Sequence, residues 1–249
     1  LIFPSVSAYG QTGPMWDRPG FDPVLQAESG MMSLTGEPDG EPMRHPLSLV
    51  DTMTGLQSVS AICAALLARE KSGRGQRIDL ALMDMAIAAL GNAGLYYLVS
   101  GEQPPRAGNA HMTSTPTTLF YASDGPLYMA LGSDRLYGQL CRDVLERPDL
   151  VDDPRFCSPA ERLANRPELF EILGDIFKTK TRAEWMAKMR HLPAGPVRQL
   201  GEALASEEVA ARGMVVELDH PKAGPIKVIG SPLNFSESKM RPYEPPPVL

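Results

Sequence analysis

Residues 46–55 and the helical pattern that follows them constrain the fold of this chain more than any other stretch of its sequence. A short apolar run reaches the acidic residue Asp51, and apolar side chains then recur at the i, i+3, i+4, i+7 spacing of an amphipathic helix. We therefore place Asp51 at or just before a helix start, where free backbone N–H groups and the helix dipole stabilise an anion by about 0.3–1 kcal/mol. Taken alone, an acidic residue here is typical of a helix N-cap.

The composition is that of an ordinary globular protein, and it argues against several classes of partner. Of the 249 residues, 43% are hydrophobic and 22% are charged, and the net charge is −6. Because no cluster of Lys and Arg offers a phosphate-binding face, we expect no nucleic-acid partner. No apolar run reaches about 18 residues, so we expect no membrane partner. The three cysteines fit no disulfide or zinc spacing, which predicts a cytoplasmic location and no metal site.

Apolar periodicity and turn residues predict strands and helices that alternate along the chain. In the first part we expect a short buried strand at 1–7, a strand at 76–80, and helices at 21–32, 51–71 and 83–99. Further on we expect a hairpin around Asp124-Gly125, helices at 134–145, 160–179, 181–191 and 206–212, and strands at 214–219 and 226–229. Because the helix at 83–99 is apolar on most faces, we expect it in the core or at a subunit interface.

Two stretches rich in proline and glycine divide this pattern, and we interpret them as crossover linkers at 101–117 and 193–200. Strands that alternate with helices on both sides of the linkers are typical of an α/β fold. We therefore predict that residues 1–100 and 200–249 are parts of one large domain. Residues 118–197 are predicted to form a smaller α/β domain.

Few side chains offer catalytic chemistry by their spacing alone. No serine lies in a Gly-x-Ser-x-Gly elbow, and the four histidines are too far apart in sequence to suggest a metal site. Cys63 and Cys141 fall in apolar helix patterns and are interpreted as core residues. Two carboxylates remain: Asp51, and Asp22, which follows a glycine-rich loop after a strand. Open α/β sheets bind ligands at such loops, and a carboxylate can act as a covalent nucleophile on an activated acyl group.

A series of short motifs runs in one order along nearly the whole chain. The longest are residues 9–14 (YGQTGP), 17–22 (DRPGFD), 35–40 (TGEPDG), 51–55 (DTMTG) and 70–76 (EKSGRGQ), and shorter ones continue to 230–232. Together these motifs resemble the class III CoA-transferases, the family that contains formyl-CoA transferase and carnitine CoA-transferase. Members of that family are longer, so the resemblance implies that an N-terminal segment, which builds much of the CoA site, is absent from this sequence.

The resemblance implies a Rossmann-like large domain with a smaller α/β domain, in an interlocked homodimer. It assigns the catalytic role to Asp51 and supporting roles in the active site to Asp22 and Phe21. We assign CoA binding to three residues of the glycine-rich loop, Gly10, Arg18 and Gly20. The implied substrates are an acyl-CoA and a small carboxylic acid, and no cofactor is expected to be bound permanently.

The reaction implied by the resemblance is covalent. The Asp51 carboxylate attacks the acyl-CoA thioester to give a mixed anhydride, and the CoA thiolate returns to form an aspartyl-CoA thioester. An acceptor carboxylate then takes the CoA. Residues 112–116 lack the glycine run of formyl-CoA transferase, which argues against a formyl or oxalate substrate.

Two alternatives remain open. An α-methylacyl-CoA racemase resembles this family closely, but such racemases carry a histidine where this chain has Phe21. A phenyl ring cannot accept a proton, so the combination of Asp51 with Phe21 favours transfer over racemisation. The second alternative is a non-catalytic fragment that is stable only with a partner chain that supplies the missing segment.

Overall fold

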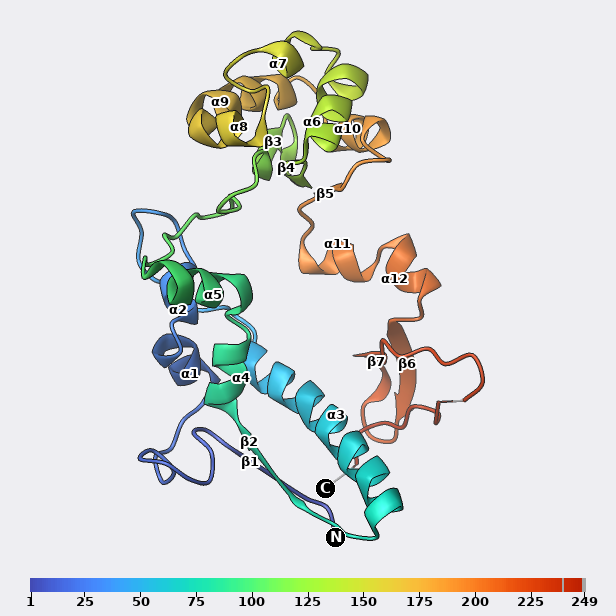
Figure 1. Cartoon of the computed structure of the whole chain (residues 1–249). Helices are drawn as coiled ribbons and strands as arrows, with labels where there is room; N and C mark the ends of the chain where they lie inside the picture. The colour runs from blue at the N-terminus through green and yellow to red at the C-terminus, as the bar shows by residue number, and fades with distance from the viewer. Residues whose placement is uncertain (239, 248–249) are drawn as a thin grey trace. The chain divides into compact units, whose positions relative to one another are not determined.

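The computed structural model describes residues 1–238 and 240–247 and confirms the predicted α/β class (Figure 1). The chain forms two compact units, which are described separately. Unit 1 combines Leu1–Leu119 with Ala130–Leu169, and unit 2 combines Phe120–Met129 with Phe170–Leu249. The predicted domain boundaries, the Rossmann-like arrangement of the large domain and the interlocked dimer stay predictions.

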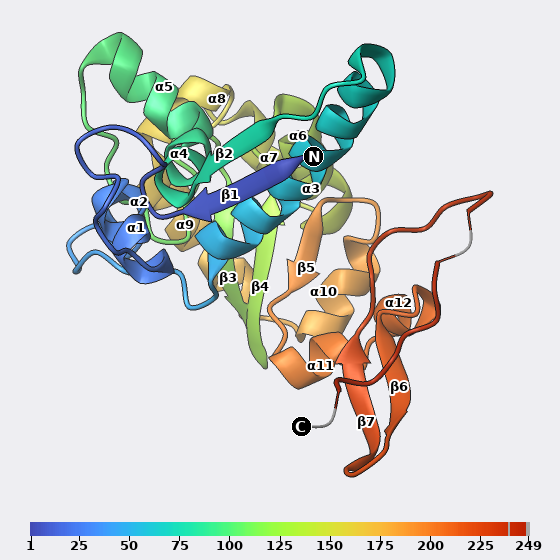
Figure 2. The same cartoon turned by 90° about the horizontal axis from the view of Figure 1, so that it is seen from below.

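Unit 1 contains a parallel pair of strands. β1 (Phe3–Ser7) pairs with β2 (Arg77–Ala81), from Phe3 opposite Arg77 to Ser7 opposite Ala81. Parallel neighbours need a crossover connection, and this one includes α3 (Leu49–Ser72), which lies alongside both strands (Figures 1 and 2). The carboxyl ends of β1 and β2 therefore meet at one edge, where the loop of residues 8–20 leaves β1.

The first turn of α3 packs into a small apolar core with α1 (Asp22–Glu28) and α4 (Leu82–Ala88). Leu25 of α1, Val50 of α3 and Ala86 of α4 are fully buried in this core. Their burial holds the start of α3 against α1, so residues far apart in sequence meet there. At its other end, α3 stops at Gly73, which adopts a left-handed backbone with φ of 69°.

Several side chains that the sequence places in the core are exposed in unit 1. Phe3 and Val6 of β1 are each more than half exposed, because the described part of this sheet has two strands and β1 pairs with β2 alone. The strand predicted at 1–7 is therefore confirmed at Phe3–Ser7, and the prediction that it is buried is wrong. Cys63 is also exposed, because it lies on the part of α3 that faces away from the elements the helix contacts, namely α1, α4 and β2.

The predicted single helix at 83–99 is wrong. α4 ends at Ala88, and α5 (Gly91–Ser100) continues at an angle of 76° to it. Gly91 has φ of 52°, in the left-handed region that glycine adopts without steric cost and that breaks a helix. Leu98 and Val99 of α5 are 81% and 80% exposed, so this segment does not lie in the core, and its role at an interface stays a prediction.

By length and composition alone, α3 is apolar enough to cross a membrane, and the bent pair of α4 and α5 passes the same test together. Core helices of soluble proteins pass this test too, so it does not identify a membrane protein. The expectation of no membrane partner stays a prediction.

Unit 1 also contains α2 (Met31–Leu34), which contacts α1, and a helical part with a buried arginine. The helices of this part are α6 (Asp134–Gln139), the π-helix η1 (Leu140–Val144), α7 (Asp149–Asp152), α8 (Pro159–Ala164) and the first residues of α9 (Arg166–Phe177). Arg162 of α8 is 1% exposed. Its guanidinium donates to the carbonyl oxygens of Thr115, Phe156 and Gly132 at 3.0–3.1 Å and to Asp134 Oδ1 at 2.8 Å. These bonds tie the segment before β3 to α6 and α8.

Most of a three-stranded sheet, in the order β3-β4-β5, belongs to unit 2. β3 (Thr117–Ala122) and β4 (Gly125–Ala130) are neighbours across the predicted turn, and β4 pairs antiparallel with β5 (Ala194–Pro196), which the sequence analysis did not predict. The rings of Phe120, Phe177 and Trp185 pack together, with centroids 5.3 and 5.0 Å apart. They hold α9 and α10 (Arg182–Lys188) on the sheet.

Two short helices and a second hairpin complete the described part of unit 2. They are α11 (Leu200–Leu204), α12 (Glu207–Ala211), β6 (Val215–His220) and β7 (Gly224–Ile229). β6 and β7 pair antiparallel, from Val215 opposite Ile229 to His220 opposite Gly224. The two strands predicted here are confirmed.

Candidate active site

Asp22 caps α3 from outside the helix. Its Oδ2 accepts hydrogen bonds from the backbone N–H groups of Val50, at 2.7 Å, and Asp51, at 3.1 Å. The side chain of Ser48, at the N-cap position itself, makes no capping bond. A helix start has unpaired backbone N–H groups and partial positive charge, so a carboxylate is stabilised there. These bonds compensate the burial of Asp22, which is 3% exposed.

Gln26 binds the other carboxylate oxygen of Asp22. Its Nε2 donates to Asp22 Oδ1 at 2.6 Å, and its Oε1 accepts from the backbone N–H of His45 at 2.8 Å. Asp22, Leu25 and Gln26 have the spacing of one helix face, and all three are buried. Asp22 is one of the residues predicted from the sequence, and Gln26 is not. The i, i+4 spacing of the two residues on a helix is the one sequence signal that points to their contact.

Asp51 lies on the first turn of α3 but does not cap it. The helix begins at Leu49, and Asp22 accepts the hydrogen bonds that an N-cap side chain would accept. The interpretation of Asp51 as an N-cap is therefore wrong. Its side chain is exposed, and it contacts no hydrogen-bond donor or cation within residues 1–238 and 240–247. The structure thus places a solvent-facing carboxylate at a helix start that another carboxylate caps.

Phe21 lies next to Asp22 at the start of α1. Its backbone is extended, and its carbonyl oxygen accepts hydrogen bonds from the N–H groups of Val24 and Leu25. Its side chain is 78% exposed. Phe21 adjoins Asp22 in the chain, and Asp22 binds the backbone of Asp51, so the structure brings these three predicted residues to one helix start.

The structure explains the two predicted glycines of the loop at 8–20, Gly10 by its backbone conformation and Gly20 by close packing. Gly10 has φ of 88°, and its N–H donates to Ser7 Oγ at 3.0 Å. A Cβ atom on Gly20 would lie 2.9 Å from Cβ of Ala8 and 3.0 Å from Cδ2 of Leu25, which is too close for a side chain without rearrangement. Contact of Gly10 and Gly20 with CoA stays a prediction.

Arg18 is paired within the chain. Its Nη2 lies 2.6 Å from Glu28 Oε1, and its guanidinium carbon lies 5.3 Å from the centre of the Tyr9 ring. The Tyr9 hydroxyl donates to Glu28 Oε2 at 2.8 Å. Hydrogen bonds from Tyr9 and Arg18 lower the pKa of Glu28, so this carboxylate stays ionised beside Arg18. An anionic group of CoA would compete with Glu28 for Arg18, and that contact also stays a prediction.

A cavity of about 320 Å³ follows the first turn of α3. It is lined by Thr54, Gln57, Asp79, Leu80, Ala81, Asp84, Met85 and Ala88. Thr54 lies about one helical turn after Asp51, which is not among the lining residues. Asp79 is already bonded at one oxygen, because its Oδ2 accepts from the N–H of Gln11 at 3.0 Å. None of the residues that line this cavity is predicted from the sequence to have a role.

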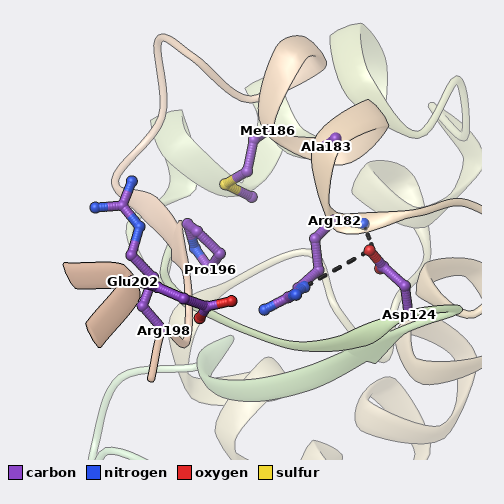
Figure 3. A pocket seen from close by; sticks show the side chains of 7 residues that line it. All are labelled: Asp124, Arg182, Ala183, Met186, Pro196, Arg198 and Glu202. Atoms are coloured by element: carbon purple, nitrogen blue, oxygen red, sulfur yellow. Dashed lines mark hydrogen bonds and ion pairs between the residues drawn. The ribbon is translucent and has the colours of Figure 1, made fainter. Parts of the chain in front are cut away.

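Another cavity, of about 300 Å³, lies in unit 2 beside the turn between β3 and β4 (Figure 3). It is lined by Asp124, Arg182, Ala183, Met186, Pro196, Arg198 and Glu202. Both arginines have partners within unit 2. Arg182 donates its N–H to Asp124 Oδ1 at 2.7 Å and its Nη1 to the carbonyl oxygen of Val197 at 3.2 Å, and Arg198 pairs with Glu208. Arg182 Nε also lies 3.7 Å from Asp124 Oδ2, and Glu202 Oε2 accepts from the backbone N–H of Gln199 at 2.8 Å, so each charged residue of the lining has a partner.

The described residues contain no group of three or more His, Cys, Asp or Glu side chains arranged to hold a metal ion. The start of α3 presents two carboxylates, the buried Asp22 and the exposed Asp51.

Comparison with known proteins gives consistent matches over the whole chain. The family model described as CoA-transferase family III matches residues 1–249. Succinate–glutarate CoA-transferase of Agrobacterium fabrum is 38% identical over 251 residues, which cover 100% of this chain and 62% of that protein. Acetyl-CoA:oxalate CoA-transferase of Acetobacter aceti is 36% identical over 239 residues, which cover 95% of this chain and 60% of that protein. The chain thus spans less than two thirds of the length of these relatives.

Solved structures agree with these matches. A CAIB/BAIF family protein from Brucella suis has a TM-score of 0.81 and 37% identity, with 97% of this chain and 63% of that chain covered. An orthorhombic crystal structure of a protein from Mycobacterium tuberculosis has a TM-score of 0.84 and 29% identity, with 96% of this chain and 64% of that chain covered.

Proposed function

Because the chain belongs to CoA-transferase family III, we propose that this protein transfers CoA from an acyl-CoA to a carboxylic acid, with Asp51 as the covalent nucleophile. The observation that carries the proposal is the exposed Asp51 carboxylate on the first turn of α3. Asp22 caps that turn, so the Asp51 side chain is not needed to hold the helix and is free to react.

The reaction balances without any further reagent. One Asp51 oxygen attacks the thioester carbon, the carbon–sulfur bond breaks, and a mixed anhydride and a CoA thiolate result. The thiolate attacks the aspartyl carbonyl, which releases the donor acid and leaves an aspartyl-CoA thioester. The acceptor carboxylate attacks this thioester to form a second anhydride. Attack of the thiolate on the acceptor's carbonyl then gives the new acyl-CoA and restores Asp51.

The first turn of α3 suits this chemistry electrostatically. The positive end of the helix dipole favours an ionised carboxylate, which is the nucleophilic form. Asp22 supports the site by fixing the backbone of Val50 and Asp51 through its two hydrogen bonds.

The names of the relatives support a small dicarboxylic acid as the acceptor. They are named for succinate with glutarate and for oxalate. Because an oxalate enzyme is 36% identical to this chain, the missing glycine run at 112–116 does not exclude that acid. A homodimer and a cytoplasmic location complete the proposal.

Transfer activity tests the proposal directly. The protein is incubated with a succinyl-, glutaryl- or acetyl-CoA donor and a panel of dicarboxylates, and the acyl-CoA products are separated by chromatography. We expect transfer by the wild type and a loss of at least about 10³-fold in kcat for Asp51→Asn, because the amide is not a nucleophile. Asp39→Asn, at an exposed turn residue, is the matched control and should retain full activity.

Three other results would redirect the proposal. Asp51→Asn with more than a tenth of wild-type activity would contradict covalent catalysis by Asp51. Exchange of the substrate's α-hydrogen for solvent deuterium, without transfer, would instead support a racemase. A folded wild type without either activity would support a fragment that needs a partner chain.

A further inference from the structure

The buried side-chain amide of Gln26 joins α1 to the segment at 45–47 by hydrogen bonds. Gln26 is 1% exposed. Its Nε2 donates to Asp22 Oδ1 at 2.6 Å and lies 3.4 Å from the carbonyl oxygen of His45 and 3.5 Å from that of Leu47. Its Oε1 accepts from the N–H of His45 at 2.8 Å. The amide therefore links α1 to the segment at 45–47 that leads directly into α3.

These contacts control the orientation of the Asp22 carboxylate. Oδ1 is held by Gln26, and Oδ2 faces the N–H groups of Val50 and Asp51. A carboxylate with one oxygen unbound would be free to rotate about its terminal torsion, which has broad preferences. Gln26 removes this freedom, and it also ties down the residues that set the direction in which α3 starts.

We propose that Gln26 is a positioning residue for the covalent step, acting on Asp51 through Asp22 and through residues 45–47. This inference rests on the proposed function. Gln26 is too buried to touch the substrate, so it acts only through the side chain and backbone that it binds. Reactive groups displaced by about 1 Å can cost about 10²-fold in rate, so a small shift of the first turn of α3 has a measurable effect.

A neutral amide is the side chain that this position requires. It must donate to the Asp22 carboxylate and accept from the N–H of His45 at the same time. An ionised carboxylate at position 26 would lie against Asp22 and repel it, and one of the two groups would have to take up a proton. Once protonated, that carboxyl group could donate to Asp22 as the amide does.

The first variant is Gln26→Met, which keeps the length of the side chain and removes its hydrogen bonds. We expect amide hydrogen exchange at Val50 and Asp51 to accelerate by about 10-fold, and kcat to fall by about 10- to 100-fold while KM for the acyl-CoA changes by less than about threefold. Gln103→Met is the control at an exposed glutamine. Leu173→Ala, in the core of unit 2, controls for a general loss of stability, and its kcat should stay near the wild-type value.

The second variant, Gln26→Glu, provides a rescue that a purely structural role would not predict. In the folded variant, the negative charge of Asp22 raises the pKa of the introduced carboxyl group. The hydrogen bond from this carboxyl group to Asp22 is therefore present at low pH and is lost as pH rises through that pKa. We expect the ratio of its kcat to that of the wild type to increase as pH falls from about 8 to about 5. The same ratio for Gln26→Met should not change with pH.

Three results would overturn the inference. The first is faster amide exchange in Gln26→Met with an unchanged kcat. The second is a fall of kcat in Leu173→Ala equal to that in Gln26→Met at the same stability. The third is unchanged amide exchange at Val50 and Asp51 in Gln26→Met. If the wild type transfers no CoA, the proposed function fails separately. Exchange at Val50 and Asp51 then decides alone whether Gln26 positions the start of α3.

Discussion

At the scale of single residues, two carboxylates at the start of α3 occupy opposite environments. Asp22 is buried, and both of its oxygens accept hydrogen bonds. Asp51 is exposed, and within the described part of the chain its carboxylate has no hydrogen-bond partner. A carboxylate saturated with donors is a poor nucleophile, because its charge is already stabilised. The structure therefore assigns capping to Asp22, and the exposure of Asp51 supports its proposed role as the nucleophile.

Arg162 is the residue whose loss we expect to destabilise unit 1 most clearly. Arg162→Met would leave the carbonyl oxygens of Thr115, Gly132 and Phe156 without this donor, at a cost of about 1–3 kcal/mol for each one that stays buried. Urea unfolding followed by circular dichroism should show a large shift to lower midpoint. Arg135→Met, at an exposed arginine of α6, should leave the midpoint close to that of the wild type. Equal midpoints for both variants would contradict this role of Arg162.

The cysteines should differ sharply in reactivity. Burial raises the pKa of the Cys141 thiol to about 11, so the reactive thiolate is scarce at pH 8 and the side chain is also shielded. Cys157 is exposed. Mass spectrometry after brief treatment with iodoacetamide should find Cys157 alkylated and Cys141 unmodified, and both modified in urea. Alkylation of Cys141 in the folded protein at the rate of Cys157 would show that its site is open.

At the scale of elements, sequence pattern succeeds where several local signals agree. α10 begins at Arg182 because Thr181 and Glu184 form a capping box, which a sequence displays directly. β5 is not predicted from the sequence, because it is three residues long and lies in a proline- and glycine-rich stretch. Its extended conformation depends on pairing with β4. Gly91 breaks a helix pattern that is otherwise continuous, and a single glycine inside such a pattern does not reveal its φ.

Paired alanine substitutions test the break between α4 and α5. A Cβ on Gly91 would meet nothing within 4 Å, so Gly91→Ala is penalised by its left-handed backbone alone, at about 1 kcal/mol. Gly55 lies inside α3, and its Cβ would also meet nothing, so Gly55→Ala should stabilise by about 0.5–1 kcal/mol. Thermal unfolding should move in opposite directions for the two variants. A stabilising Gly91→Ala would mean that α4 and α5 favour one continuous helix.

At the scale of the whole molecule, the sequence identifies the family more completely than it identifies the site. The motif of residues 51–55 points to Asp51 through resemblance, and the amphipathic pattern places that residue at a helix start. The capping of α3 by Asp22 spans 28 residues between Asp22 and Val50, so no local pattern contains it. Gln26 and the residues that line the cavity beside α3 depend on the same tertiary packing.

The exposed apolar side chains of α5 support the proposed homodimer. Leu95, Leu98 and Val99 are each more than 60% exposed, and exposed apolar surface of this kind is typical of interfaces. Light scattering coupled to gel filtration should give twice the mass of one chain. We expect Leu98→Glu to weaken the dimer, because the interface would bury an unpaired charge. A monomer at micromolar concentration would contradict the proposal.

The covalent role of Asp51 is the central claim, and trapping the enzyme-bound intermediate tests it most directly. The protein is mixed with an acyl-CoA donor that it accepts, quenched with hydroxylamine, digested, and analysed by mass spectrometry. A hydroxamate on Asp51, absent from Asp51→Ala and from samples without donor, is the predicted result. A protein that turns over acyl-CoA while its Asp51 peptide stays unmodified, or that carries the hydroxamate on another carboxylate, would contradict the account.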